Sequence, residues 1–409
     1  MPYDLAQMQS LPLRAKIIMT HQRARQWYEY WDGQVYVSLS GGKDSTVLAD
    51  LCAQVCRDYG WTLYLLFVNT GLEYPEIQKF VKTYAEWLRQ TYSIEVVLDI
   101  VRPEMRFDEV IKKYGYPVVS KAVSQHIKAG RTALKKGNQN SFALQMFRGE
   151  YKDANGDKSL FNQEQWAFLL DAPYDISNQC CDVMKKRPIK KYEKISRRKP
   201  IIGTMASESR HRYTQWVKFG CNAFDKNKPS SQPISFWTEQ DILHYLKQFN
   251  VPYCSVYGDI VVDEKVDGEN ILEGQINLID YLGCHEESDR LTTTGCSRTG
   301  CIFCMFGCHL EKEPNRFQRL KETHPRQYEY CINGGEYVWE ATYKNRAIGK
   351  IQKVSWVNDD GTPMTKEQIE KFVEKRNIEG SIFTFKKVWQ PSKEGLGLGK
   401  VLDYIGVKY

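Results

Sequence analysis

Two groups of residues in this chain of 409 amino acids have the types and spacing to do chemistry. The first is a glycine-rich loop, made up of Ser40, Gly41, Gly42, Lys43, Asp44 and Ser45. Glycine lets the backbone approach a ligand closely, lysine adds a positive charge and serine adds a hydroxyl donor. These residue types predict a site for the phosphate groups of a ligand. The second group is a set of paired cysteines.

The segments on either side of the loop decide how it is presented. Before it, Val35, Val37 and Leu39 alternate with other residues, which predicts a strand. After it, apolar residues recur at helical spacing from Val47 to Val55. A loop between a strand and a helix places the free N–H groups of the first helical turn at the ligand.

The amino-acid sequence of the loop indicates a family. The phosphate loop of common NTPases needs a longer spacing between its glycines, which is absent here. SGGKDS instead resembles the PP-loop of the adenine nucleotide α-hydrolase superfamily, which includes ATP pyrophosphatases and the sulfonucleotide (PAPS/APS) reductases. The resemblance implies that residues 40–45 hold the phosphates or phosphosulfate of an adenine nucleotide, with Lys43 and Asp44 in the reaction. An ordinary glycine-rich turn is the alternative.

The rest of the chain predicts the fold. Strands at 62–69 and 94–100 alternate with helices at 75–92 and 105–114, which is typical of a doubly wound α/β fold with a mainly parallel sheet. Ligands of such sheets bind at the carboxyl ends of the strands, where the loop lies. We expect three regions: a helical segment at 1–33, a PP-loop domain at 34–310 and an α+β extension at 311–409. Within the domain, we expect an insertion at about 115–176, with helices at 121–136 and 162–170.

Two further segments resemble parts of the PAPS reductases. Residues 69–76 resemble their "DTG…FPET" stretch, with asparagine in place of aspartate, and residues 203–212 resemble "GxRxxES…R". Arginine suits bidentate recognition of phosphate or sulfate oxygens. We therefore predict that Arg210 and Arg212 clamp the far anion and that Arg210 takes part in catalysis. The other predicted nucleotide-binding residues are Asn69, Gly71 and Glu208. The helix that follows Thr238, which resembles "WTEEDVWxYI", is interpreted as structural.

The cysteines form two clusters, Cys180-Cys181 and Cys296-x4-Cys301-x2-Cys304-x3-Cys308. Thiolates are soft ligands that suit zinc or an iron–sulfur cluster. The first cluster resembles "CCxxRKxxPL" and residues 298–304 resemble "SxGCxxC" of the 4Fe-4S sulfonucleotide reductases. That resemblance implies one 4Fe-4S cluster on Cys180, Cys181, Cys301 and Cys304. Two alternatives remain: a local site, holding iron–sulfur or zinc, completed by Cys296 and Cys308, or buried thiols without a metal.

Positive charge is concentrated in one segment. The formal net charge is +7, and residues 185–199 contain nine lysines and arginines against the single acid Glu193. Such a segment could bind a polyanion, either the phosphates of a small nucleotide or a nucleic-acid backbone, or an electron-donor protein. A solvated basic linker is the alternative. The start of the sequence has no secretion signal and no apolar run is long enough to span a bilayer, so we expect a cytoplasmic protein.

One feature of the reductases is missing. They attack their substrate with a cysteine in a C-terminal "ECGxH" tail, and this sequence has no cysteine after Cys331. Either Cys331 or Cys308 replaces it, or the reaction differs. Three hypotheses follow. The first is an enzyme acting on PAPS in sulfur metabolism. The second is an ATP pyrophosphatase that adenylates a target, with Asp44 orienting Mg²⁺, so that sulfur is inserted, for example into nucleic acid. The third is a non-catalytic nucleotide and redox sensor.

Overall fold

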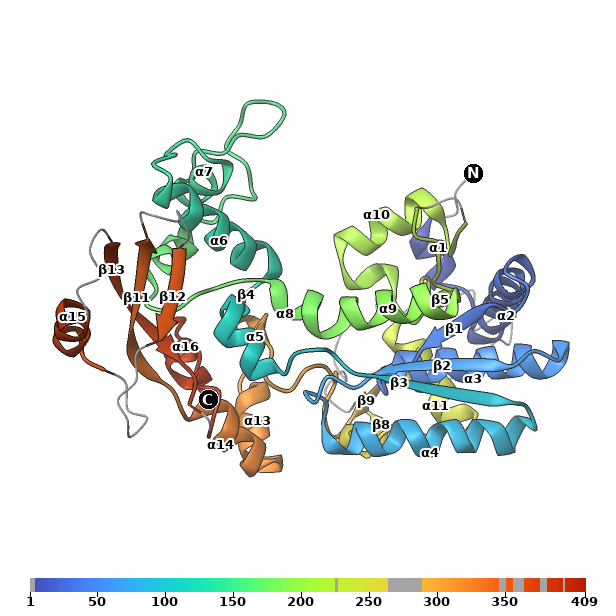
Figure 1. The fold of residues 1–409 in the computed structure, drawn as a ribbon. Helices are drawn as coiled ribbons and strands as arrows, with labels where there is room; N and C mark the ends of the chain where they lie inside the picture. Colours follow the sequence, from blue (N-terminus) through green and yellow to red (C-terminus); the bar gives the residue numbers. More distant parts are fainter. Residues whose placement is uncertain are drawn as a thin grey trace. The chain divides into compact units, whose positions relative to one another are not determined.

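The computed structural model describes residues 4–224, 227–263, 289–345, 351–355, 364–375, 381–392 and 394–409. The chain forms two compact units (Figure 1). Unit 1 comprises Met1–Pro103 and Arg187–Cys301, and unit 2 comprises Glu104–Lys186 and Ile302–Tyr409. The predicted insertion and C-terminal extension thus belong to the same unit, while the region boundaries expected from the sequence stay a prediction.

Unit 1 is built on a six-stranded sheet in the order β3-β2-β1-β5-β7-β6. Neighbouring strands of this sheet pair in parallel, except that β6 is antiparallel to β7. In the centre, Val37 pairs with Leu65 on one side and Ile201 on the other. The mainly parallel α/β sheet predicted from the sequence is confirmed. Its strands are β1 (Val35–Ser38), β2 (Leu63–Val68), β3 (Val96–Val101), β5 (Lys199–Ile202), β6 (Asn222–Ala223) and β7 (Ser230–Ser231).

Helices cover both faces of this sheet. In Figure 1, α4 lies below the strands and α9 lies above them. The predicted helix at 75–92 is α4, with Pro75 in its first turn, where the missing N–H costs nothing. The N-terminal segment is two helices, because Pro12 separates them. The helices are α1 (Leu5–Gln9), α2 (Leu13–Tyr30), α3 (Lys43–Tyr59), α4 (Pro75–Tyr92), α9 (Arg187–Ser196), α10 (Arg210–Phe219) and α11 (Glu239–Gln248). A separate two-stranded antiparallel sheet pairs β8 (Ile260–Val262) with β9 (Leu291–Thr293).

Two buried charges fix α11 against the other helices of unit 1. Lys16 of α2 is only 2% exposed and donates to both carboxylate oxygens of Asp241 at 2.7 Å. Asp50 of α3 is fully buried and accepts hydrogen bonds from Tyr245 (2.6 Å), Tyr92 (2.8 Å) and Gln54 (3.0 Å). Burial raises the pKa of the Asp50 carboxyl and these three donors oppose the shift. Since buried charges are tolerated only when paired, α11 is held in one position.

Unit 2 combines short helices with an antiparallel sheet. Its sheet has the order β12-β11-β13, and β4 pairs in parallel with β10. The helix predicted at 121–136 is α6, and the one at 162–170 is a 3₁₀ helix, Glu164–Asp171. A π-helical segment, Asp182–Lys186, follows Cys181.

The elements of unit 2 have the following bounds. The strands are β4 (Val118–Val119), β10 (Met305–Phe306), β11 (Glu336–Asn345), β12 (Ile351–Ser355) and β13 (Ser381–Gln390). The helices are α5 (Phe107–Tyr114), α6 (Lys121–Lys135), α7 (Phe142–Arg148), α8 (Gln179–Cys181), α13 (Arg316–Thr323), α14 (Pro325–Ile332), α15 (Lys366–Lys375) and α16 (Leu398–Tyr404). None of the helices among the described residues has the length and apolar character needed to cross a membrane.

The Asp50 cluster gives a test of the packing. Replacing Tyr245 by phenylalanine removes the shortest of the three hydrogen bonds and leaves a buried carboxylate short of a donor. We expect the free energy of unfolding in urea to fall by about 1–3 kcal/mol. Tyr30→Phe is the control, because Tyr30 is 59% exposed, and it should change stability by less than about 0.5 kcal/mol. Equal stability of the two variants would contradict this role for Asp50.

Candidate functional site

The loop of residues 40–45 turns from β1 into α3, with one glycine inside the turn and a second packed against it. Gly41 has φ +75°, and a Cβ on it would lie 2.7 Å from Cγ2 of Ile77 in α4. A Cβ on Gly203, just after β5, would lie 3.2 Å from the backbone of Asp44. The start of α3 is therefore enclosed by backbone on which no larger side chain fits well.

The two serines of the loop brace it through hydrogen bonds within the loop. The hydroxyl oxygens of Ser40 and Ser45 are 2.9 Å apart, and the Ser40 N–H donates to the Ser45 hydroxyl at 3.1 Å. Ser45 also donates to the carbonyl of Gly42 at 2.9 Å. The geometry of the turn is thus fixed before any ligand binds.

A cavity of about 200 Å³ opens at the N-terminus of α3. It lies at the carboxyl end of β1, where the fold predicts a ligand site. Its walls come from the loop, from the segment after β5, from the first turn of α11 and from residues 257–299. The lining residues are Ser40, Gly42, Lys43, Asp44, Met205, Glu208, Glu239, Tyr257, Ser297, Arg298 and Thr299.

The charges around this cavity are internally balanced. The Lys43 ammonium donates to Glu239 at 3.0 Å, and Arg212 forms an ion pair with Glu208. Burial raises the pKa of the Asp44 carboxyl, and the positive charges of Lys43, Arg298 and Arg212 oppose that shift. Burial and the nearby Arg298 lower the pKa of Arg212. Two arginines and a lysine therefore surround one buried carboxylate, which suits a site for an anion held with a divalent cation.

Tyr257 occupies the first N–H group of α3. Its hydroxyl oxygen accepts from the Lys43 N–H at 3.2 Å and lies 2.7 Å from the Thr299 hydroxyl. The Lys43 ammonium is 5.3 Å from the centre of the same ring. Burial raises the pKa of Tyr257 to about 12, so the hydroxyl is neutral at physiological pH. The Tyr257 oxygen therefore takes a place that a phosphate oxygen would use.

Some predicted site residues lie elsewhere. The Asn69 side chain accepts from the Gly71 N–H at 3.1 Å in a turn after β2, and neither residue lines the cavity. Arg210 is exposed at the start of α10 and does not line it either. Ser45 and Gly41 shape the loop from behind, and Arg212 reaches Asp44 only through its charge. The roles assigned to these residues stay predictions.

The structure adds residues that sequence reasoning missed. Glu239 belongs to the helix that was interpreted as purely structural, so that interpretation was incomplete: the helix also brings a carboxylate to Lys43. Arg298 and Thr299 lie just before Gly300 and Cys301 of the cysteine motif. That motif was interpreted only for its metal ligands, so the place of these two residues at the cavity was not predicted. Tyr257 has no signal in the sequence.

The cysteines of unit 2 form a second polar centre. The sulfur atoms of Cys180 and Cys181 are 3.9 Å apart. A hydrogen bond from Cys180 lowers the pKa of Cys181 to about 6 against the effect of burial, with help from Lys121, Lys185 and Lys186. Burial raises the pKa of Cys304, and the charge of Cys181 adds to this. The lowered pKa favours the thiolate form of Cys181, and thiolate is the form that binds metals.

This centre fits thiolate ligation in its chemistry. The sulfur separation of 3.9 Å resembles the edge of a zinc tetrahedron, about 3.8 Å for Zn–S bonds of about 2.3 Å. Cys308 also lies in unit 2, donating to the Met305 carbonyl at 3.1 Å, and burial raises its pKa to about 12. Cys296 and Cys301 belong to unit 1. Within the part of the chain that the structure describes, no three His, Cys, Asp or Glu side chains are grouped closely enough to hold a metal ion.

Comparison with known proteins identifies the family. The family model described as "Phosphoadenosine phosphosulfate reductase domain" matches residues 34–144 and 146–305, about two thirds of the chain. The chain belongs to this family. The match covers the PP-loop, the cavity residues and Cys180, Cys181, Cys301 and Cys304.

Other comparisons add little. None of the curated proteins matches the chain. A solved structure, the NH3-dependent NAD synthetase from Campylobacter jejuni subsp. jejuni NCTC 11168 in complex with the nitrate ion, is 13% identical and has a TM-score of 0.26. The similarity covers 59% of this chain and 75% of the synthetase. A TM-score this low supports no inference about the site of this PAPS reductase family member.

The buried carboxyl of Asp44 predicts a pH-dependent stability. Its pKa is raised in the folded protein, so the folded state holds the proton more tightly than the unfolded state. The free energy of unfolding therefore falls as pH rises through the raised pKa, and this loss is absent in acid below the unfolded value. We expect Asp44→Asn to be more stable than wild type at neutral pH and no different at acid pH.

Urea denaturation at a series of pH values measures this difference. Asp58→Asn is the control, since the Asp58 side chain is half-exposed at the other end of the same helix. An Asp44→Asn effect of the same size at all pH values would show that charge burial at Asp44 is not its cause.

Proposed function

We propose that this PAPS reductase family member is an enzyme that binds an adenine nucleotide in the cavity at the start of α3. We further propose that it acts on the phosphosulfate or phosphates in sulfur metabolism. The observation that carries this proposal is the meeting of the α3 N-terminus, Lys43 and Arg298 around one cavity at the carboxyl end of β1. The N–H groups of a helix N-terminus and the cations beside them favour a phosphate or sulfate group there.

We propose tasks for four charged residues in and beside the cavity. The N–H groups of the loop and Lys43 hold the phosphate nearest to α3, and Arg298 with Arg212 neutralises the far anion. Arg298 lines the cavity while Arg210 does not, so we assign to Arg298 the clamping role first given to Arg210. The Asp44 carboxylate would hold Mg²⁺ if the nucleotide is ATP, because magnesium prefers oxygen ligands.

The reaction has two candidate forms. With a phosphosulfate, a thiolate would bond to sulfur as the bond from sulfur to the phosphate oxygen breaks. A reductant would then supply two electrons to release sulfite. With ATP, an acceptor oxygen would bond to the α-phosphorus as the bond to the bridging oxygen breaks and pyrophosphate leaves.

One observation favours the ATP form. A cysteine nucleophile must be accessible and ionised. Cys331 and Cys308 are the candidates suggested by the sequence, yet both are buried, and burial raises the pKa of each thiol. Neither is placed to attack a substrate, so we propose adenylation of a target, with sulfur supplied at the cysteine centre, as the second candidate function. If a nucleotide binds without turnover, the function left is that of a non-catalytic nucleotide and redox sensor.

We propose that Cys180, Cys181, Cys301 and Cys304 bind a 4Fe-4S cluster, which would supply electron transfer or sulfur handling. The chain's own contribution is the positive charge of Lys121, Lys185 and Lys186, which favours the thiolate of Cys181.

We also propose that the basic segment 185–199 binds a negatively charged partner, either nucleic acid or an electron-donor protein. On α9, Arg187, Lys190, Lys191 and Lys194 recur at the spacing of one helix face and all are exposed. Its other side is tied to the sheet, since Tyr36 donates to Glu193 at 2.8 Å and Tyr192 donates to Asp99 at 2.7 Å. A continuous cationic face suits a polyanion.

The nucleotide site is tested by binding and turnover. We expect Lys43→Ala to weaken binding of ATP with Mg²⁺, or of PAPS, by about 10- to 100-fold in calorimetry, because the variant cannot make a charge-assisted hydrogen bond to the phosphate. Lys79→Ala, an exposed lysine on α4, should bind as wild type. Unchanged affinity of Lys43→Ala would remove this cavity as the site. Chromatography of the products distinguishes sulfite plus adenosine bisphosphate from AMP plus pyrophosphate.

The cysteine centre is tested by metal content. We expect anaerobically purified protein to be brown and to contain iron, and Cys180→Ser or Cys181→Ser to lose both colour and iron. Cys221→Ser is the control, because that thiol contacts the Ser235 hydroxyl at 3.3 Å and is not one of the predicted ligands. Loss of metal in Cys308→Ser but not in Cys180→Ser would establish the alternative ligand set. Colourless protein with stoichiometric zinc would overturn the iron–sulfur assignment.

A further inference from the structure

The helix α6 of unit 2 has an unusual charge distribution. Its sequence, KAVSQHIKAGRTALK, contains Lys121, Lys128, Arg131 and Lys135 and no acidic residue. The three lysines are seven residues apart, which places them on one face, and all three are exposed. Helix surfaces normally intersperse acids at i+3 or i+4, which offsets repulsion between like charges. On α6, nothing within the helix does so.

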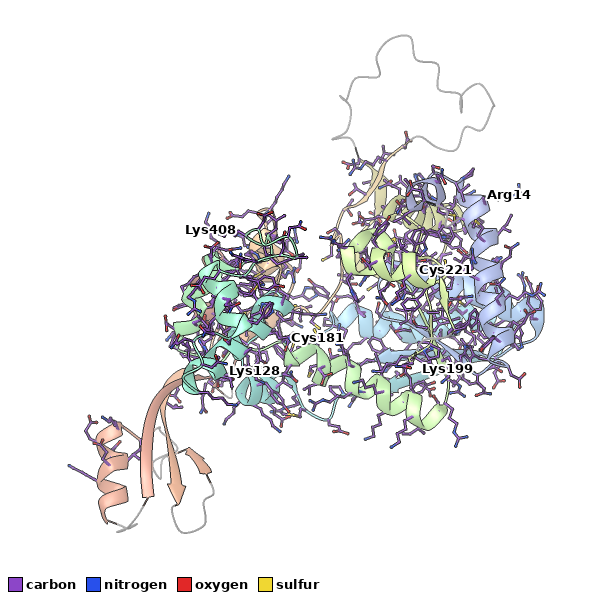
Figure 2. All side chains as sticks on the ribbon, turned by 90° about the horizontal axis from the view of Figure 1, so that it is seen from above. Arg14, Lys128, Cys181, Lys199, Cys221 and Lys408 are labelled. Atoms are coloured by element: carbon purple, nitrogen blue, oxygen red, sulfur yellow. The ribbon has the colours of Figure 1, made fainter. Side chains whose placement is uncertain are left out.

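This face of α6 borders a cavity of about 490 Å³. The cavity is bounded by the C-terminal end of α5, by α6 and by residues 170–176, all within unit 2. Its charged lining comprises the cations Lys113, Lys128, Arg131 and Lys135 and the acids Asp171 and Asp175. Cations outnumber acids by two. Lys128, the middle of the three lysines along α6, is labelled in Figure 2.

Arg131 is a fixed positive charge in the wall of this cavity. Its side chain is 16% exposed, and its closest carboxylate oxygen, that of Asp175, is 3.9 Å away and belongs to a half-exposed side chain. Carbonyl groups orient the guanidinium without cancelling its charge. They are those of Leu169 (2.8 Å), Leu170 (2.9 Å), Ala172 (2.7 Å) and Tyr174 (2.7 Å). An anion in the cavity would meet a charge whose position is already set.

Tyr114 supplies an aromatic face at the same place. The ammonium groups of Lys113 and Lys128 lie 5.4 Å and 6.0 Å from the centre of its ring. The two ammonium groups beside this ring repel each other. An anion bound between them would attract both and so offset the repulsion. Cations that follow a groove, combined with an aromatic ring on which a base can stack, are the features of sites for single-stranded nucleic acid.

We propose that this cavity binds the phosphate backbone of a single-stranded nucleic acid, with Tyr114 as the stacking surface for one base. Paired bases in a duplex are stacked internally and cannot reach a ring in a cavity, so a single strand fits better. The volume of 490 Å³ lies within the usual range for a site that encloses one ligand unit of drug size. This site does not depend on the nucleotide cavity of unit 1.

The direction of the bound strand follows from the same helix face. Gln125 lies between Lys121 and Lys128, and its side-chain oxygen accepts a hydrogen bond from the Asn178 side chain at 3.2 Å. Asn178 lies two residues before Cys180. A strand that follows α6 from the cavity toward its N-terminus would therefore approach the cysteine pair. If adenylation and sulfur insertion are the reaction, which rests on the proposed function, this strand is the acceptor.

The test uses the full chain and a fluorescein-labelled single-stranded RNA of about 12 nucleotides. Binding is measured by anisotropy between about 50 and 200 mM salt. The variant Lys113→Ala with Lys135→Ala removes two cavity lysines. The control, Lys112→Ala with Lys136→Ala, removes their exposed sequence neighbours, which do not line the cavity, and has the same net charge.

We expect the cavity variant to bind less tightly and to reduce the slope of log K against log salt by about 1.4, or about 0.7 for each phosphate that is no longer neutralised. The control should keep the wild-type slope. Lys128→Ala should reduce the slope by about 0.7, and Tyr114→Leu should weaken binding at every salt concentration without changing the slope. Wild-type affinity of these variants for ATP with Mg²⁺ or for PAPS, measured by calorimetry, separates this site from the one in unit 1.

Three results would overturn the proposal. The first is an equal loss of RNA binding in the cavity and control variants. The second is a loss confined to Lys190→Ala with Lys194→Ala on α9. The third is displacement of the RNA by inorganic phosphate or AMP at an equal phosphate concentration, which would show a site for small anions.

Discussion

The close approach of backbone around the first turn of α3 is the constraint on which the nucleotide site depends. Gly41 needs a positive φ and has no space for a Cβ beside Ile77 of α4, and Gly203 brings the end of β5 within contact distance of Asp44. A side chain at either position would push the strand and the helix apart. The cavity would then lose the convergence of N–H groups and cations that makes it attractive to an anion.

Around this turn, the protein supplies its own substitutes for a ligand. Glu239 neutralises Lys43, Glu208 neutralises Arg212, and the Tyr257 hydroxyl occupies the Lys43 N–H. A nucleotide would therefore exchange existing hydrogen bonds and ion pairs for new ones, so its net affinity reflects the difference between the two sets. The buried Asp50 and Lys16 interactions keep α11 in place during such an exchange, because breaking them would leave charges unpaired in the core.

Much of this arrangement could be predicted from the sequence, since it rests on local signals. Alternating valines, the double glycine and Pro75 defined β1, the loop and the start of α4. The missed residues come from interactions between distant parts of the chain. Tyr257 lies 214 residues from Lys43 and sits in a 3₁₀ turn with no motif. Glu239 lies in α11, a helix whose apolar face was sufficient to explain it as structural. Only the packing of α11 against α3 shows that this helix also brings a carboxylate to Lys43.

The bond between Tyr257 and Thr299 has a consequence for cooperativity. Thr299 lies two residues before Cys301, a predicted cluster ligand in the same unit. A nucleotide that displaces the Tyr257 hydroxyl removes one of the hydrogen bonds that hold the Thr299 segment, and the backbone carries that change toward Cys301. If a cluster is bound there, nucleotide occupancy and cluster affinity are thermodynamically linked, and each must alter the other by the same factor. The state of the metal centre would then set how readily the enzyme accepts its nucleotide.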